Sequence, residues 1–198
     1  MTFLRGIRRF LRRKPAPSMI VAVILSIKYK CRVSWSADIH FPWNLKIGKG
    51  ADIGKCLIIA TGNGVNIGNN VSIGYGSVLD ALGGYISIDE FSALAPYVVA
   101  YGQGGLQVGR YNMVASHATI VASSHVYSSV DIPIKMQGTS ASGIATADDV
   151  WIGANVVIQD GVKLGRGVIV GSGAVVRSSF PEFSIIAGVP AKIICTRQ

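Results

Sequence analysis

Aliphatic residues recur at every sixth position between residues 152 and 181. The residues that open successive sixes are Ile152, Ile158, Leu164, Val170 and Val176, and glycine follows three of them. A period of six is neither the helical period nor simple strand alternation. It fits a chain that coils in flat-sided turns and directs one aliphatic side chain inward from each side. Glycine in the second place suits a tight corner.

The same spacing continues toward the N-terminus in groups of three sixes, with a small surplus of residues between groups. The aliphatic openers are Ile27, Val33, Ile39, Ile47, Ile53, Ile59, Ile67, Ile73, Leu79, Ile88, Leu94, Ala100, Val108, Val114 and Ile120. Three sixes and a surplus make one turn of a three-sided prism, so the surplus loops stack along one edge. We therefore predict an all-β fold, a parallel β-helix of about seven coils over residues 27–181 that is about 35 Å long.

The two ends of the chain depart from this repeat. Residues 1–26 form a basic N-terminal arm, in which residues 3–13 place apolar side chains on one stripe of a short helix and arginines on the other. Pro15 and Pro17 end that helix. Such a helix either rests on a membrane surface or caps the open end of the solenoid, and the sequence favours neither. Residues 182–198 are expected to form a C-terminal tail outside the repeat.

The net charge of +9 belongs to the N-terminal segment. Residues 1–32 contain nine Lys or Arg and no acidic residue, whereas the remaining chain has ten of each sign. The absence of a basic groove in the repeat argues against nucleic acid as a partner. Residues 19–27 are apolar but too short to span a bilayer as a helix, and no signal-peptide cleavage site follows them. Cys31, Cys56 and Cys195 are odd in number and lack metal spacing, which predicts reduced thiols in a cytoplasmic protein.

One interruption of the repeat is much longer than the others. After Ser123-Ser124-His125, about twenty residues pass before the sixes resume near Thr146. Long loops in compact repeats are usually functional, so residues 126–145 are predicted to be an active-site loop. The histidine at its start can accept and return a proton near neutral pH.

Taken together, these features resemble the hexapeptide-repeat acyltransferases, above all the maltose and galactoside O-acetyltransferases and the acetyltransferases of polysaccharide biosynthesis. Three motifs carry the resemblance beyond the repeat, namely Ser123-Ser124-His125, the DVWIG sequence at residues 149–153 and the GVPAK sequence at residues 188–192. The resemblance covers residues 27–198. It implies a left-handed β-helix, and the handedness comes from the resemblance alone, because the general rule for parallel crossovers favours a right-handed coil.

The resemblance also implies an acetyl-CoA-dependent O-acetyltransferase that acts on a sugar or glycan precursor in cell-surface polysaccharide biosynthesis. The family is homotrimeric, binds acetyl-CoA in grooves between subunits, uses no metal and transfers the acetyl group directly. By this resemblance His125 is the general base, and Ala154 offers its backbone N–H to the thioester carbonyl. Ser172 contacts the pantetheine arm and Lys192 approaches the nucleotide phosphates. Arg177, also expected to bind the cofactor, stands where the family often has Thr followed by Lys.

Other residues are expected to shape the site. Trp151 packs the base of the loop and shapes the groove. His117 lies inside a regular six and lines a groove, while His40 lies several turns away and is structural. The loop is expected to select the acceptor through polar side chains, for which the candidates are Tyr127, Asp131, Lys135 and Gln137.

Three alternatives stay open from the sequence. An amino-sugar N-acetyltransferase would use the same fold, and a non-catalytic trimeric scaffold could attach to the inner face of the cell membrane through residues 1–14. A zinc enzyme of the γ-carbonic anhydrase type needs about three protein ligands, commonly histidines. His117 and His125 are the only neighbouring histidines, and their spacing does not suit a zinc site.

Overall fold

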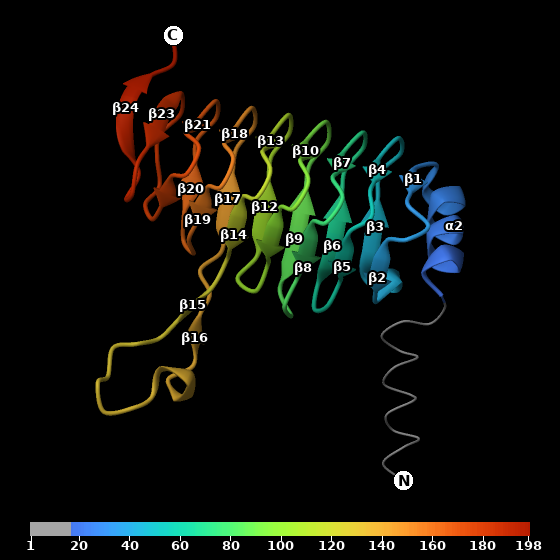
Figure 1. Ribbon diagram of the computed structural model, residues 1–198, viewed down its shortest axis with the longest axis horizontal. Helices are drawn as coiled ribbons and strands as arrows, with labels where there is room; N and C mark the ends of the chain where they lie inside the picture. Colours follow the sequence, from blue (N-terminus) through green and yellow to red (C-terminus); the bar gives the residue numbers. More distant parts are fainter. Residues whose placement is uncertain (1–16) are drawn as a thin grey trace.

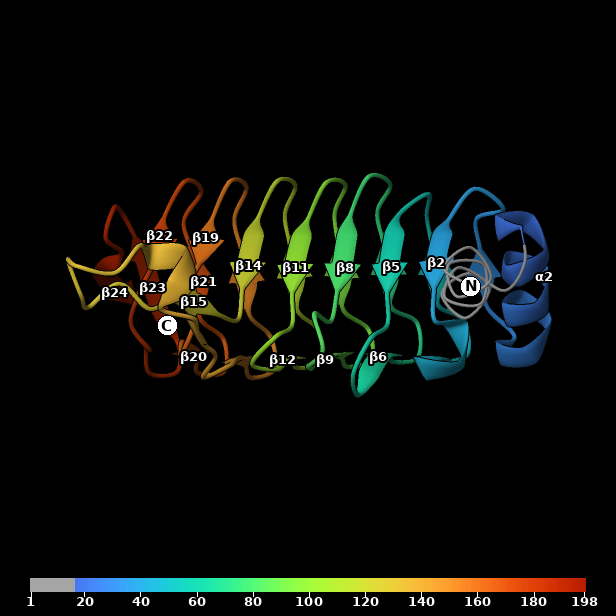
Figure 2. The same cartoon turned by 90° about the horizontal axis from the view of Figure 1, so that it is seen from below.

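The computed structural model describes residues 17–198, which form a three-sided column of short parallel strands (Figure 1). The predicted helix over residues 3–13 lies outside the described residues. Three sheets make the faces of the column, here called faces A, B and C in the order in which each coil meets them. Figure 2, seen from below, looks onto face B, with the strands of face C along one margin. The parallel β-helix expected from the period of six is confirmed.

The strands of each face stack in the order given by the sheet topology. Face A contains β1 (Arg32–Val33), β4 (Asp52–Ile53), β7 (Ser72–Ile73), β10 (Ala93–Leu94), β13 (Met113–Val114), β18 (Trp151–Ile152), β21 (Ile169–Val170), β23 (Ser184–Ala187) and β24 (Lys192–Thr196). Face B contains β2 (Asp38–His40), β5 (Leu57–Ile59), β8 (Val78–Asp80), β11 (Val99–Tyr101), β14 (Thr119–Val121), β19 (Val157–Ile158) and β22 (Val175–Val176). Face C contains β3 (Leu45–Ile47), β6 (Gly64–Ile67), β9 (Tyr85–Ile88), β12 (Leu106–Val108), β17 (Ile144–Thr146) and β20 (Lys163–Leu164). The remaining elements are α2 (Ser18–Tyr29), the 3-10 turns η1 (Pro42–Asn44) and η2 (Ile134–Met136), and the strand pair β15 (Ser124–His125) and β16 (Thr139–Ser140).

Each strand directs its repeat residue into the core, and these residues form rows along the column. On face B the row runs through Ile39, Ile58 and Leu79, which are paired in register and almost fully buried. The predicted opener Ile59 is therefore wrong by one residue. The corner after Ile53 has one residue fewer than the corresponding corner of the next coil, so the inward position comes one residue earlier.

The surplus residues of each coil lie on the edge between faces B and C, as predicted from their spacing. Gly62 and Gly83 occupy this edge in successive coils with positive φ values of 59° and 85°. A Cβ atom on Gly62 would lie 1.9 Å from the carbonyl oxygen of Gly83. Glycine at residue 62 is thus required both by the backbone conformation and by the close approach of the next coil.

Helix α2 covers the N-terminal end of the column, where the first coil would otherwise expose the core (Figure 1). Val21, Ala22 and Leu25 are buried in the hydrophobic core cluster. Ile27 was predicted to open the first coil, but it belongs to α2 and is 75% exposed. The solenoid therefore begins at β1 and not at residue 27. The described helices include none that is long and apolar enough to cross a membrane.

The C-terminal residues extend the column instead of leaving it. Strand β23 continues face A in parallel with β21, and Ile186 is buried beside Val170. Strand β24 then pairs antiparallel with β23 and ends the face. The expected tail over residues 182–198 is therefore a strand pair that covers the last coil.

A buried asparagine side chain connects the coil before the long interruption to the segment that leads into the DVWIG sequence. The side chain of Asn112 is fully buried. It donates to the Gly109 carbonyl, the Thr146 hydroxyl and the Ala147 carbonyl at 3.0 Å each. Its Oδ1 accepts from the Val150 backbone N–H at 2.6 Å. Because Thr146 and Val150 follow the long interruption, this one side chain holds the chain in place where the repeat resumes.

Replacing Asn112 with alanine is expected to lower the free energy of unfolding by about 3 kcal/mol, because several buried polar groups lose their partner. Urea denaturation followed by circular dichroism measures this. Asn69→Ala is the control, since Asn69 is exposed and its side chain accepts one hydrogen bond, from the Lys49 N–H at 2.9 Å. Its replacement should cost about 1 kcal/mol or less. Equal losses in the two variants would contradict the role given to Asn112.

Candidate active site

The long interruption forms a hairpin that projects from the edge between faces B and C (Figures 1 and 2). After β14 the chain enters β15, turns, and returns through β16 to rejoin face C at β17. Strands β15 and β16 pair antiparallel, with Ser124 opposite Ser140 and His125 opposite Thr139. The predicted loop is therefore a strand pair with an ordered tip, which we call the 124–140 hairpin.

The tip of the hairpin is held by the side chain of Gln137. Its Oε1 accepts from the Ser129 backbone N–H at 3.0 Å. Its Nε2 donates to the carbonyls of Ser129 at 2.8 Å and Ile132 at 2.7 Å. Gln137 was a candidate for acceptor binding, but both ends of its amide are used to order the hairpin. Tyr127, Asp131 and Lys135 are exposed on the same tip.

His125 lies at the foot of the hairpin and is exposed. Among residues 17–198 its imidazole takes part in no hydrogen bond or ion pair. Its backbone is fixed by the pairing of β15 with β16, and Gln103 donates to the Thr139 hydroxyl at 3.2 Å from the body of the column. The side chain is thus carried by ordered backbone and is accessible for proton transfer to a bound substrate.

A second group of candidate residues lies on the edge between faces A and B. Ala154 and Ser172 occupy this edge in adjacent coils, and the Gly173 N–H donates to the Ala154 carbonyl at 2.8 Å. The Ala154 N–H donates to no backbone acceptor among residues 17–198. It is therefore available as an oxyanion donor. The structure brings these two positions together, as the resemblance implies.

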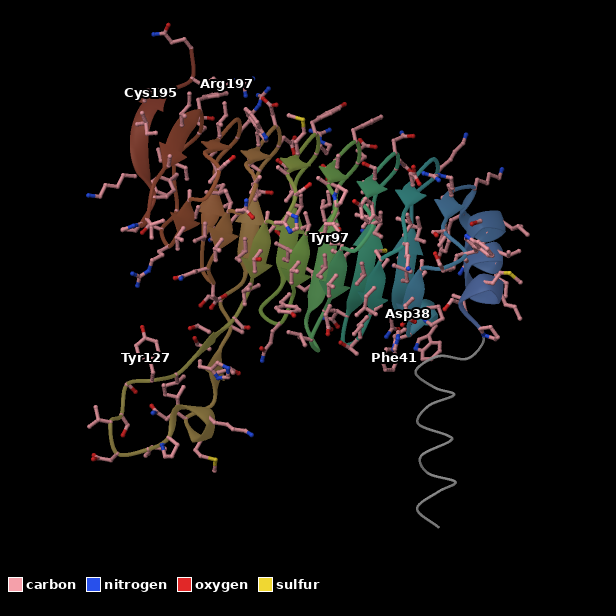
Figure 3. The ribbon with its side chains drawn as sticks, in the orientation of Figure 1. Asp38, Phe41, Tyr97, Tyr127, Cys195 and Arg197 are labelled. Carbon is pink, nitrogen blue, oxygen red and sulfur yellow. The ribbon has the colours of Figure 1, made fainter. Side chains whose placement is uncertain are left out.

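His117 lies on the same edge, one coil before Ala154. Its ring stacks on Tyr97 with centroids 5.1 Å apart, and Tyr97 meets Tyr75 edge-on at 5.0 Å. Figure 3 labels Tyr97 midway along the β-helix. The side-chain hydrogen bond between Tyr97 and Tyr75 raises the pKa of Tyr97. His117 thus ends an aromatic column and lies away from the hairpin, in agreement with its expected place inside a regular six.

Trp151 lies on the outer side of face A and not at the base of the hairpin. It is 48% exposed and is paired in register with Met113. Together with Tyr75 and Pro96 these residues line an open groove of about 550 Å³ on face A. Sequence reasoning missed Met113 and Tyr75. The signal for Met113 was present, because Met113 and Trp151 each precede an inward residue by one position and must point outward on the same face.

The acidic residues beside Trp151 are structural. Arg110 donates to Asp148 through Nε at 3.1 Å and Nη2 at 2.8 Å, and its guanidinium lowers the pKa of that carboxyl. Asp149 accepts from Arg197 Nη1 at 2.8 Å, which ties the chain terminus to the edge between faces C and A. The first residue of the DVWIG sequence therefore holds the fold, and its tryptophan is the part that faces solvent.

One protomer does not bring the candidate base and the candidate cofactor residues together. His125 lies on the B–C edge, whereas Ala154 and Ser172 lie on the A–B edge. Arg177 directly follows β22 on face B, and Lys192 begins β24 at the end of face A. All of these side chains except the partly exposed Ala154 are exposed. Residues 17–198 contain no cluster of three or more His, Cys, Asp or Glu side chains placed to bind a metal.

Comparisons with known proteins agree with this architecture. The family described as bacterial transferase hexapeptide (six repeats) matches residues 146–178. The Escherichia coli K12 protein WbbJ, named for O-acetyl transfer in lipopolysaccharide biosynthesis, is 37% identical over 147 residues, which cover 70% of this chain and 74% of WbbJ. A Mycobacterium tuberculosis protein named as an acetyltransferase is 32% identical over 152 residues, 77% of this chain. This chain spans 50% of that relative's length.

A solved structure extends the likeness to three dimensions. A single-residue variant of AntD, an N-acyltransferase from Bacillus cereus, was solved with dTDP-4-amino-4,6-dideoxyglucose and coenzyme A. It is similar with a TM-score of 0.63 and 25% identity, and the match covers 89% of this chain and 88% of AntD. The parallel β-helix built on a six-residue period is the architecture of the hexapeptide-repeat transferases that this chain matches. The chain belongs to the bacterial hexapeptide transferase family and is an acyltransferase.

Proposed function

We propose that the protein transfers the acetyl group of acetyl-CoA to a hydroxyl of a sugar or glycan precursor in cell-surface polysaccharide biosynthesis. The observation that carries the proposal is the accessible imidazole of His125 on an ordered hairpin, in a chain 37% identical to WbbJ. The likeness to WbbJ favours a hydroxyl acceptor. The likeness to AntD favours the second candidate, an amino-sugar N-acetyltransferase.

The site is proposed to lie between neighbouring subunits of a homotrimer. His125 and the Ala154–Ser172 pair lie on different edges of the column, so a neighbouring copy must supply one of them. A general base must come within hydrogen-bond reach of the hydroxyl that it deprotonates. The hairpin supports this arrangement, since its tip exposes Val130 at 97% and Met136 at 74%. Apolar surface of this kind is suited to contact with another subunit or with the acceptor.

In the proposed reaction, His125 takes the proton of the acceptor hydroxyl while its oxygen attacks the thioester carbonyl carbon. The Ala154 N–H stabilises the negative oxygen of the tetrahedral intermediate. The carbon–sulfur bond then breaks, and the imidazolium returns its proton to the departing thiolate. The products are an acetyl ester and free coenzyme A. Ser172 contacts the pantetheine arm, Arg177 and Lys192 lie near the nucleotide phosphates, and Trp151 and His117 line the proposed groove between subunits.

We also propose that the protein works in the cytoplasm, with contact to the inner face of the membrane through residues 1–14. The three cysteines support a reducing compartment, since none of them is paired. Burial raises the pKa of the Cys56 thiol to about 12, so this residue is an unreactive part of the core. Residues 1–14 themselves lie outside the described part of the chain.

An acceptor screen tests the proposed activity. The protein is incubated with acetyl-CoA and a panel of sugars, nucleotide sugars and oligosaccharides, and the release of free thiol is followed. We expect turnover with hydroxyl acceptors and a product whose acetyl group is removed by mild alkali, because esters are labile and amides are stable under these conditions. Alkali-stable product formed only from amino sugars would replace the O-acetyl proposal by N-acetyl transfer. Absence of thiol release with every acceptor would contradict the proposed class of acceptor.

A further inference from the structure

Helix α2 has two apolar sides, and only one of them is used by the fold. The helix lies across the N-terminal end of the column, transverse to the long axis (Figures 1 and 2). One side is buried against the first coil. The opposite side is a continuous aliphatic surface at the end of the molecule, formed by Met19 (55% exposed), Ile20 (47%), Val23 (52%), Ile24 (57%) and Ile27 (75%). Residues 18–27 include no charged residue.

Two exposed tryptophans lie in the first coil, which α2 covers. Trp35 lies on the A–B edge of the first coil and is 71% exposed, and Trp43 lies in η1 on the B–C edge and is 55% exposed. Trp43 packs edge-on against Phe41 with centroids 5.7 Å apart. Figure 3 labels Phe41 beside the helical end of the column. Two of the three tryptophans in the chain are therefore exposed on the coil that α2 covers, and the indole ring is well suited to the boundary between lipid and water.

The described residues at this end carry a net positive charge. Residues 17–51 contain five Lys or Arg, namely Lys28, Lys30, Arg32, Lys46 and Lys49, and one acidic residue, Asp38. Lys28 and Lys30 follow the aliphatic surface directly, and Lys28 lies 4.7 Å from the centre of the Tyr29 ring. Arg32 pairs with Asp52 in the next coil. From residue 52 onward the chain has eight basic and nine acidic residues, so among the described residues the positive excess lies in α2 and the first coil.

These observations discriminate between partners. A second copy docked through the same surface would bring two ends of net positive charge together, and like charges oppose such a contact. An anionic lipid surface accepts aliphatic side chains, indole rings and lysines at the same time. A helix of 12 residues suits a position in the plane of the interface.

We propose that the N-terminal end of the column, made of α2 and the first coil, is a docking surface for an anionic lipid bilayer. The long axis then stands upright on the membrane, with the aliphatic side of α2 in the interfacial layer. Strand β14 lies four strand spacings above β2, so the 124–140 hairpin begins about 20 Å above the first coil. This inference is independent of the acetyl acceptor, and its test measures lipid binding without turnover.

Vesicle flotation of the full-length protein tests the proposal. We expect binding to phosphatidylcholine vesicles that contain phosphatidylglycerol, weaker binding to phosphatidylcholine alone, and loss of binding as salt is raised. The double variant Ile24→Glu/Ile27→Glu should reduce the partition coefficient at least about tenfold, since two aliphatic anchors become anions. Both side chains point away from the core, so thermal unfolding should stay as in the wild type. Ile194→Glu is the matched control, because Ile194 is 66% exposed at the opposite end.

A second measurement locates the contact. In a Trp151→Phe background the fluorescence comes from Trp35 and Trp43, and we expect a blue shift and quenching by brominated lipid on vesicle addition. Failure of the full-length protein to bind vesicles containing phosphatidylglycerol would overturn the proposal. Wild-type binding by the double variant would also overturn the proposal. This holds even if deletion of residues 1–16 abolishes binding, because the contact would then be made by residues 1–16 and not by α2. A self-association that the double variant abolishes, without lipid binding, would assign the surface to a second copy.

Discussion

Replacing His125 with alanine is expected to lower kcat by about a hundred- to ten-thousandfold, the usual contribution of a positioned general base. The KM for acetyl-CoA should change little, because Ala154 and Ser172 lie on another edge of the column. Thermal unfolding and subunit assembly should be unchanged, since the imidazole is exposed and holds no other described residue in place. Steady-state kinetics with thiol detection measures kcat and KM, thermal denaturation measures stability, and sedimentation velocity measures subunit assembly.

His117→Ala is the matched control for this variant. His117 is the other histidine of the middle coils, and it stacks on Tyr97 instead of joining the hairpin. Its loss should lower kcat by about tenfold at most, and added imidazole should partly restore only the His125 variant. A larger loss of kcat in His117→Ala than in His125→Ala would transfer the role of base to His117.

The repetitive part of the fold could be predicted because every coil needs one buried aliphatic residue on each face, at a regular spacing along the sequence. Where two neighbours were both aliphatic, as with Ile58 and Ile59, the period could not choose between them. Ile58 is the buried one because the corner after Ile53 is one residue shorter than in the next coil. Ile27 shows the same limit, because its distance from Val33 fits the repeat although the residue belongs to a helix. Spacing alone does not distinguish an aliphatic residue in a coil from one in a capping helix.

The candidate site was predictable in its components and less so in its geometry. The interruption after His125 and the edge from which it leaves followed from the surplus residues. The antiparallel pairing of β15 with β16 and the use of Gln137 inside the tip did not, because they depend on contacts within a segment that has no repeat. The sequence predicted that Trp151 packs the base of the hairpin, whereas strand β18 holds Trp151 on the outer side of face A. That position follows from strand alternation once the coil is known.

Mixing two inactive variants is expected to restore activity. His125→Ala removes the proposed base, and Ser172→Trp should block the proposed pantetheine path while preserving the fold, because Ser172 is exposed on a corner. If each site takes His125 from one subunit and the Ser172 edge from the next, every mixed trimer contains one site with both parts intact. Random assembly from equal amounts of the two variants should therefore recover about a quarter of wild-type activity.

The amount recovered identifies how the site is built. Each variant alone should stay inactive after the same unfolding and refolding procedure, and mixing the assembled variants without subunit exchange should restore nothing. A site contained within one protomer would give no recovery in any mixture, since each subunit carries one defect. The separation of His125 and Ser172 on two edges of the same column favours recovery, because only a neighbouring copy can place the hairpin of one subunit over the corner of another.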